Sequence, residues 1–220
     1  MFPEAILLDY DGVIVDSEPL YERVERRQFA RYGINPSLED WAQFKGISAE
    51  AFFRLIKEKY LPETNISELN VEWQADLLKE FRENLSFVQG FESFYAQALG
   101  KTKLAIVTST SKEIITWIGE NSNRLPTADL IITADDVQNT KPHPEPYLKA
   151  AEMLGIAPDR SLVIEDSVHG IRSGLAAGAK VLAFSTSLDA KFLKEAHAVV
   201  GHFGEITPAL LDTIMNNGKI

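Results

Sequence analysis

The stretch Ala5–Glu18, AILLDYDGVIVDSE, decides the fold of this chain. Its first four residues form an apolar run typical of a strand that is buried on both faces of a sheet. The run stops at two carboxylates, Asp9 and Asp11, and Gly12 then permits a turn. Buried carboxylates need a neutralising group, and in parallel α/β sheets ligands bind at this end of the strands. Mg²⁺, a hard cation held by oxygen ligands, would supply the charge, whereas the alternative is an ordinary acidic turn.

Length and composition favour a globular protein of one or two domains. The chain has 220 residues, 45% of them hydrophobic and 25% charged, and no apolar stretch long enough to span a membrane. The start of the chain, Met1–Glu4, has no basic region, so we expect no signal peptide. There is no cysteine, which excludes disulfides, thiolate ligands and a thiol nucleophile and fits a cytoplasmic location.

The charge balance is strongly acidic. Formal net charge is −10, from 22 basic and 32 acidic residues. This disfavours binding to nucleic acid or to an anionic membrane through bulk charge. An anionic substrate would be repelled at long range, so a phosphate site has to be built locally from a few lysines, hydroxyls and backbone N–H groups.

Between Ser17 and Leu85 the apolar residues follow a helical period, and no segment has the pattern of a strand. Ser17, Ser37 and Ser48 are candidate helix caps, and a helix is predicted from about Ile66 to Asn84. We interpret this segment as a small helical bundle inserted after the first strand.

Beyond residue 86, predicted strands alternate with predicted helices, which implies a mostly parallel sheet. The strands are 103–107, 129–133, 161–164, 179–184 and 198–200. The predicted fold class is α/β, with a Rossmann-like three-layer core made of residues 1–16 and 86–220. Residues 17–85 form a helical cap domain, and the two glycine-containing joints between the domains are predicted to act as a hinge.

Reactive side chains follow several strands or loops of the predicted sheet. They are Asp9 and Asp11; Thr108 and Ser109; Lys141; and Glu165 and Asp166. The carboxyl ends of parallel strands share one edge, so these groups would meet there and supply the parts needed for phosphoryl transfer. Each also has a structural alternative: Thr108 as a helix cap, Lys141 as a solvated loop residue, and the acidic pair as a helix start.

Taken together, these residues resemble the four motifs of the haloacid dehalogenase superfamily. The matching segments are Asp9-Tyr10-Asp11-Gly12-Val13, Thr108, Lys141-Pro142, and Glu165-Asp166-Ser167 with Gly170. The resemblance covers nearly the whole chain, because one branch of that superfamily carries a helical cap after the first motif. The subgroup that the chain looks like contains sugar-phosphate phosphatases and β-phosphoglucomutase.

The resemblance implies an aspartyl-phosphate mechanism. Asp9 would attack phosphorus and bind Mg²⁺. Asp11 would protonate the leaving oxygen, then activate water, and its main-chain carbonyl would bind the metal. A carboxyl that must carry a proton at neutral pH needs surroundings that raise its pKa.

The resemblance also implies how phosphate and metal are held. Thr108, the N–H of Ser109 and Lys141 would hold the transferring phosphoryl group. Asp166 would ligate Mg²⁺, with Glu165 beside it as a ligand or as a supporting group.

The second carboxylate, Asp11, disfavours a dehalogenase activity, since the dehalogenases that this chain resembles lack an acid at this position. The cap segment Phe44–Ser48 is similar to the substrate loop of the mutase, but two positions depart from it: Tyr21 stands where the mutase has His, and Ala49 where it has Arg. We therefore expect a phosphatase, with a β-phosphoglucomutase-type mutase as the alternative. Tyr21 and Lys45 are the candidate substrate residues of the cap.

The expected partner is a small phosphorylated metabolite. We expect the protein to be a monomer that binds neither nucleic acid nor membrane. A third hypothesis is a non-catalytic binding protein on the same fold, because fold alone does not imply activity.

Overall fold

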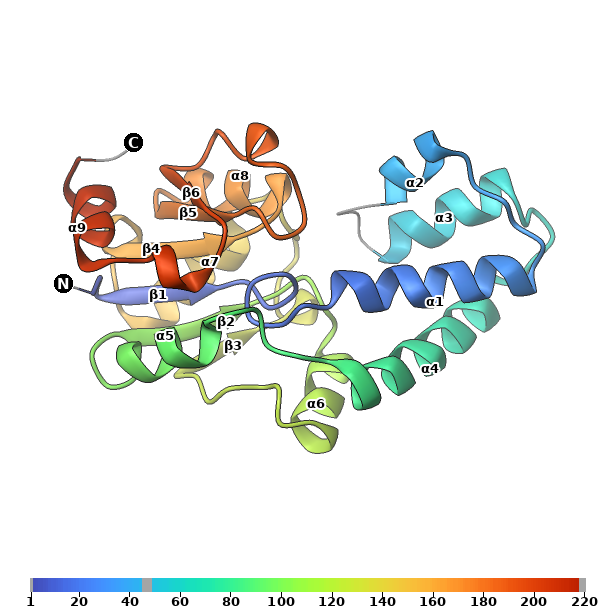
Figure 1. Cartoon of the computed structure of the whole chain (residues 1–220), viewed down its shortest axis with the longest axis horizontal. Helices are drawn as coiled ribbons and strands as arrows, with labels where there is room; N and C mark the ends of the chain where they lie inside the picture. Colours follow the sequence, from blue (N-terminus) through green and yellow to red (C-terminus); the bar gives the residue numbers. More distant parts are fainter. Residues whose placement is uncertain (1, 45–48, 218–220) are drawn as a thin grey trace. The chain divides into compact units, whose positions relative to one another are not determined.

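The computed structural model describes residues 2–44 and 49–217 of the chain (Figure 1). These residues divide into two compact units, with the divisions between Asp16 and Ser17 and between Leu85 and Ser86. The larger unit holds residues 1–16 and 86–220, and the smaller holds the segment between them. No helix in the described part of the chain is long and apolar enough to cross a lipid bilayer.

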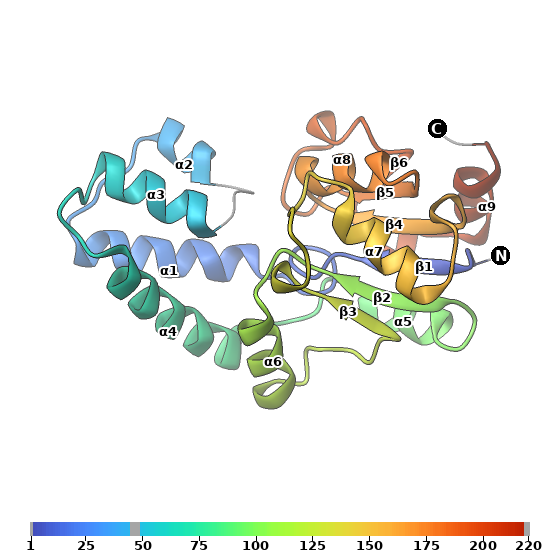
Figure 2. The same cartoon turned by 180° about the vertical axis from the view of Figure 1, so that it is seen from behind.

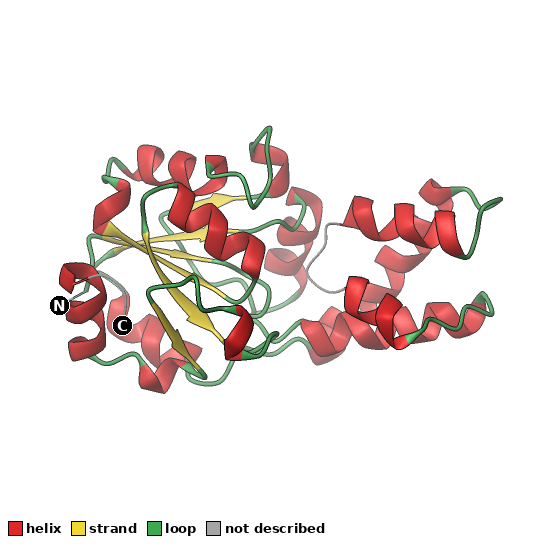
Figure 3. Ribbon diagram, turned by 90° about the horizontal axis from the view of Figure 1, so that it is seen from above, coloured by secondary structure: helices red, strands yellow, loops and turns green. Residues whose placement is uncertain are grey.

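The larger unit is built on one sheet of six parallel strands, which confirms the predicted α/β class. In chain order these are β1 (Ala5–Leu8), β2 (Lys103–Val107), β3 (Leu130–Ile132), β4 (Ser161–Glu165), β5 (Lys180–Phe184) and β6 (Ala198–Val200). They lie side by side in the order β3-β2-β1-β4-β5-β6. Figure 3 shows the strands fanned by the usual twist of such sheets.

Helices cover both faces of this sheet, which gives the three layers of a Rossmann-like core. The helices of this unit are α5 (Phe91–Ala98), α6 (Lys112–Asn121), α7 (Glu145–Leu154), α8 (Val168–Ala176) and α9 (Pro208–Asn217). Short 3₁₀ turns are η1 (Ala134–Asp136), η2 (Pro158–Arg160), η3 (Ala190–Phe192) and η4 (Phe203–Glu205). Helix α7 packs on β1, β2 and β3, and α8 packs on β4 and β5. Helix α5 lies in front of the sheet in Figure 1 and behind it in Figure 2, opposite α7.

The apolar strands are buried on both faces, as their composition predicts. In β1 every residue is at most 2% exposed. Leu7 belongs to the cluster that packs beneath α7 and α8, together with Val107, Val163 and Val181. Alternate residues of a strand point to opposite faces, so Ile6 and Leu8 face the other layer.

The described residues of the smaller unit form four helices around an aromatic core. These are α1 (Glu18–Arg31), α2 (Leu38–Phe44), α3 (Ala49–Lys59) and α4 (Ile66–Asn84). The ring of Phe29 lies 5.3 to 6.3 Å, centroid to centroid, from the rings of Trp41, Phe44, Phe52 and Trp73.

Polar contacts join α1 to α4 in this unit. The carboxylate of Glu80 accepts a hydrogen bond from Arg27 and lies 3.4 Å from Arg23, and Gln28 donates to Asp76 at 2.7 Å. Because Gln28 and Glu80 are buried, these bonds satisfy groups that would otherwise be costly inside the bundle.

The helix starts differ in part from the predictions. Ser17 is the residue before α1, but its side chain makes no capping hydrogen bond, because its backbone is already helical (φ −92°, ψ −24°). Ser37 does cap α2, since its hydroxyl accepts from the N–H of Asp40 at 3.1 Å. Ser48 lies outside the described residues. Helix α9 was not predicted.

The two chain segments that lead to the boundary between the units run side by side within the larger unit. The N–H of Asp16 donates to the carbonyl of Ser86 at 2.9 Å, and the N–H of Val88 donates to that of Ile14 at 3.0 Å. The two segments therefore restrain each other through backbone hydrogen bonds.

Candidate active site

The register of the sheet explains why the motif residues meet. Leu8 is paired with Ile106 on β2 and with Ile164 on β4. The next residue, Asp9, therefore lies level with Val107 and Glu165, and the N–H of Asp9 donates to the carbonyl of Ile164 at 3.0 Å. Three parallel strands thus end together at one edge of the sheet, where ligands bind in open α/β folds.

Lys141 connects the strand ends. Its ammonium donates to Asp9 Oδ1 at 2.6 Å, to Glu165 Oε1 at 2.6 Å and to the carbonyl of Val107 at 2.8 Å. The Lys141 side chain is only 5% exposed. The alternative of a solvated loop lysine is therefore wrong, and the loop before α7 supplies a buried cation to the first and fourth strands.

The carboxylate of Glu165 is occupied by protein donors. Besides Lys141, its Oε1 accepts from the hydroxyl of Tyr147 at 2.9 Å. Its Oε2 accepts from the N–H groups of Asp166 at 3.1 Å and Ser167 at 3.2 Å, and from the Ser167 hydroxyl at 3.0 Å. A carboxylate offers about four lone-pair sites. Glu165 therefore holds Lys141 and the following loop in place.

Helix α8 begins at Ser167, whose hydroxyl accepts from the N–H of Gly170 at 2.9 Å. The N-cap residue of α8 is thus Ser167. Glu165 is the last residue of β4, one residue beyond the predicted end of that strand. A Cβ added to Gly170 would lie 1.7 Å from Glu165 Oε1. Glycine at this position lets the helix approach the carboxylate closely.

Three buried carboxylates form a cluster that fits a cation. Asp9, Glu165 and Asp166 each place a carboxylate oxygen within 4.8 Å of the other two. Among the described residues this cluster contains no side-chain oxygen of Asp11, whose predicted metal ligand is its main-chain carbonyl. Lys141 pairs with two of these three carboxylates, so acidic groups are in excess, and an all-oxygen donor set suits Mg²⁺.

The ionisation of the cluster agrees with that excess. Burial, together with the charges of Glu165 and Asp11, raises the pKa of Asp9 to about 8, although Lys141 acts in the opposite direction. Burial also opposes the charged form of Glu165, but Lys141 and the other donors outweigh it and lower the pKa of Glu165. Lys141 therefore balances one carboxylate, and a further positive charge beside Asp9 would favour the ionised form of Asp9.

Asp11 is held by the loop after β2. The hydroxyl of Thr110 donates to Asp11 Oδ2 at 2.6 Å, and the N–H of Thr110 donates to the Thr108 hydroxyl at 3.0 Å. Helix α6 is capped by Ser111, so the helix-cap interpretation of Thr108 is wrong. Thr108 is buried beside the strand ends, and Ser109 is exposed.

The two substrate residues predicted for the cap belong to the smaller unit. Tyr21 is half-buried and packs edge-on against the ring of Phe81, with 5.6 Å between centroids. Lys45 lies outside the described residues.

Four supporting side chains were missed by the sequence argument: Thr110, Tyr147, Thr186 and Ser187. The hydroxyl of Ser187 donates to Asp166, and that of Thr186 donates to the carbonyl of Gly12 at 2.8 Å. A usable signal was present for these two, because they follow β5 at the same edge of the sheet as the recognised motifs. Tyr147 carried no signal beyond its place on the apolar face of a helix.

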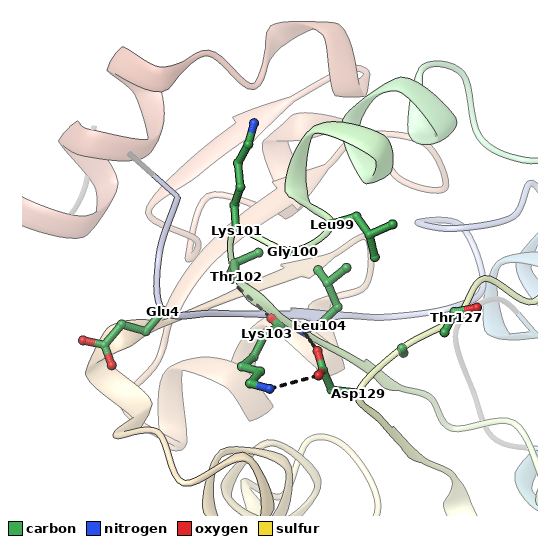
Figure 4. Close-up of a pocket in the computed structure, with 10 residues that line it drawn as sticks. Glu4, Leu99, Gly100, Lys101, Thr102, Lys103, Leu104, Thr127 and Asp129 are labelled. Carbon is green, nitrogen blue, oxygen red and sulfur yellow. Dashed lines mark hydrogen bonds and ion pairs between the residues drawn. The ribbon is translucent and has the colours of Figure 1, made fainter.

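A cavity of about 560 Å³ lies elsewhere in the larger unit, near the amino ends of β1, β2 and β3 (Figure 4). Lys103 forms an ion pair with Asp129 there at 3.1 Å, and Asp129 also accepts from the N–H of Leu104 at 2.9 Å. Lys103 and Asp129 are thus paired with each other, and the cluster of reactive groups is at the opposite ends of these strands.

Comparison with known proteins points to one family. Residues 6–184 match the haloacid dehalogenase-like hydrolase family. Hexitol phosphatase A of Escherichia coli (strain K12) is 29% identical over 216 residues, covering 93% of each chain. Pyrophosphatase PpaX of Bacillus cereus (strain AH820) is 28% identical over 213 residues, covering 94% of this chain and 96% of the relative.

A similar solved structure is that of a Thermotoga maritima protein provisionally described as a β-phosphoglucomutase. It superposes with a TM-score of 0.74 and 28% sequence identity, covering 90% of this chain and 94% of that one. The similarity extends through both units, since the two relatives and the solved structure cover 93%, 94% and 90% of this chain.

Proposed function

The chain belongs to the haloacid dehalogenase-like hydrolases, and from that premise we propose that it is a Mg²⁺-dependent phosphatase. Its substrate would be a small phosphomonoester, such as a sugar phosphate, and its intermediate an aspartyl phosphate on Asp9. One observation carries this proposal: Lys141 joins Asp9 to Glu165 beside Asp166, at the edge where the strands end. A nucleophile, a buried cation and surplus carboxylates are the parts that phosphoryl transfer requires.

In the first step the carboxylate of Asp9 attacks phosphorus. The new bond joins Asp9 to phosphorus, and the bond from phosphorus to the substrate oxygen breaks. Asp11 gives its proton to that leaving oxygen, so the alcohol departs neutral. Thr110 holds the Asp11 carboxyl through one oxygen, which orients it for this transfer.

In the second step Asp11 takes a proton from water, and the water oxygen attacks phosphorus. The bond between phosphorus and Asp9 breaks, which restores the carboxylate and releases inorganic phosphate. Asp11 is then protonated again for the next cycle.

Other residues would hold the charged groups during both steps. Thr108, the N–H of Ser109 and Lys141 would bind the phosphoryl oxygens. Asp9 and Asp166 would hold Mg²⁺, with the Asp11 carbonyl as a third ligand. Bound Mg²⁺ would supply positive charge near the carboxylates and the phosphoryl oxygens. The contacts of Glu165 support a positioning role, because its oxygens already accept from five protein donors.

The choice of phosphatase over mutase rests on the cap. Ala49 has no side chain that could hold the second phosphate of a bisphosphate, and Tyr21 replaces the expected His. We propose that residues 17–85 supply the side chains that select the substrate, Tyr21 and Lys45 among them. The mutase stays the second candidate because of the Thermotoga maritima structure. Cytoplasmic location and a monomeric state remain predictions.

The test is a panel of sugar and polyol phosphates, assayed for phosphate release with Mg²⁺ and with EDTA. Release that needs Mg²⁺ is expected. In a parallel reaction, β-glucose 1-phosphate is supplied with a trace of glucose 1,6-bisphosphate. Glucose 6-phosphate forming faster than inorganic phosphate would establish the mutase, and no turnover or binding of phosphate esters under any condition would favour a non-catalytic protein.

Asp11→Asn should slow turnover by about 10²-fold or more, because an amide cannot exchange the proton. Both formation and breakdown of the phospho-enzyme should slow, as measured by rapid quench. Asp16→Asn is the matched control, since Asp16 is an exposed carboxylate in the same loop. Equal rates for the two variants would remove Asp11 from the mechanism.

A further inference from the structure

The loop after β5 brings two hydroxyls to the proposed metal centre. Phe184 is the last residue of β5, and Ser185, Thr186 and Ser187 follow it at the carboxyl edge of the sheet. The Ser187 hydroxyl donates to Asp166 Oδ2, and the Thr186 hydroxyl donates to the carbonyl of Gly12 at 2.8 Å. We call these two residues the hydroxyl clasp.

The backbone at Gly12 shows how closely the parts of this region meet. Gly12 has a φ of +74°, and a Cβ added there would lie 1.9 Å from Asp166 Oδ2 and 2.8 Å from the Ser187 hydroxyl oxygen. The loop after β1, the carboxylate of Asp166 and the clasp are therefore in direct contact.

We propose that Ser187 is a positioning residue for the metal carboxylate Asp166, and that Thr186 holds the first-motif loop against it. The inference rests on the proposed metal site. A hydrogen bond to Oδ2 restricts the rotation of the Asp166 carboxylate, which contributes an oxygen to the cluster with Asp9 and Glu165. Groups that hold metal ligands in this way commonly change metal affinity by about 10–100-fold when removed.

The neighbouring serine provides a matched control. Ser185 lies in the same loop, but its N–H and hydroxyl both donate to the carbonyl of Val200, at 2.9 and 3.4 Å. It therefore contacts β6 and not the carboxylate. Loss of its hydroxyl tests whether any disturbance of this loop affects the metal site.

The experiment measures Mg²⁺ binding to the full chain by isothermal titration calorimetry, without substrate. Ser187→Ala should raise the dissociation constant for Mg²⁺ by about 10-fold or more. Ser187→Thr, which keeps the hydroxyl, should restore it, and Ser185→Ala should leave it unchanged. Thr186→Val keeps the shape of the side chain and should also weaken binding, which gives a second test should Ser187→Ala fold poorly in EDTA.

The outcomes separate this inference from the proposed function. A wild-type protein that does not bind Mg²⁺ contradicts the metal site itself. Wild-type binding together with an unchanged constant in Ser187→Ala and Thr186→Val overturns the clasp alone. Equal weakening in Ser185→Ala also overturns it, because the effect would then belong to the loop as a whole.

Discussion

Asp9→Asn is expected to lower phosphatase turnover by about 10⁴-fold or more while the fold stays intact. The amide nearly matches the carboxylate in shape, but it is a poor nucleophile. No phospho-enzyme should accumulate, as read by mass spectrometry of acid-quenched reactions. Turnover at the wild-type rate would exclude an aspartyl phosphate at this position.

The same substitution has a stability readout that does not depend on activity. Because the pKa of Asp9 is raised to about 8, the folded protein without metal resists ionisation of this side chain, whose ordinary value is 3.8. The resulting loss of folding stability is absent at pH values below the ordinary pKa of 3.8. It grows as pH rises from there to the raised pKa of about 8, and it is complete at higher pH.

In EDTA, Asp9→Asn should therefore melt at a higher temperature than the wild type at pH 9, and at a similar temperature near pH 4. A variant that melts far below the wild type at both pH values would show that the side chain is needed for folding, and the loss of activity would then carry no mechanistic weight.

Lys141→Met should destabilise the fold by about 3–5 kcal/mol, because it removes the cation from a buried pair and leaves the carboxylates unpaired. Burial alone would lower the pKa of Lys141, but Asp9 and Glu165 outweigh it and raise that pKa well above its ordinary value. Methionine fills similar space without charge. Urea unfolding of the wild type and the variant in EDTA measures the difference.

Lys103→Met is the matched control for this loss. Lys103 also forms an ion pair, with Asp129 at 3.1 Å, but its side chain is 56% exposed. Exposed pairs of this kind contribute about 1 kcal/mol or less. Similar losses of unfolding free energy for the two variants would show that the buried ion pair is no more stabilising than the exposed one. Phosphatase activity should be lost in Lys141→Met and kept in Lys103→Met.

Much of the fold could be predicted because its signals are local. The four-residue spacing of Leu69, Trp73, Leu77 and Phe81 predicts α4, whose observed bounds are Ile66–Asn84. Short apolar runs that alternate with helices predict the parallel sheet, and β2 and β6 have the predicted bounds. Helix α9 was not predicted, although Leu211 and Ile214, three residues apart, are buried.

The residues of the candidate site differ in whether the sequence alone could identify them. Asp9, Thr108, Lys141 and Asp166 could be named because each follows a strand or loop at a recognisable spacing. Thr110 could not, since hydroxyl residues are common in loops and only its hydrogen bond to Asp11 distinguishes it. Glu165 could be named, but its role depends on five donors from three separate segments of the chain.

By itself, then, the sequence determined the order of strands and helices, the inserted helical segment and the residues at the strand ends. These follow from periodicity and from the polarity of neighbouring residues, which are properties of the chain alone. Only the tertiary structure decided that Lys141 bridges Asp9 and Glu165, which lie 132 and 24 residues away along the chain. A hydrogen bond depends on the distance and direction between two atoms, and across such separations only the packed sheet and its register set them.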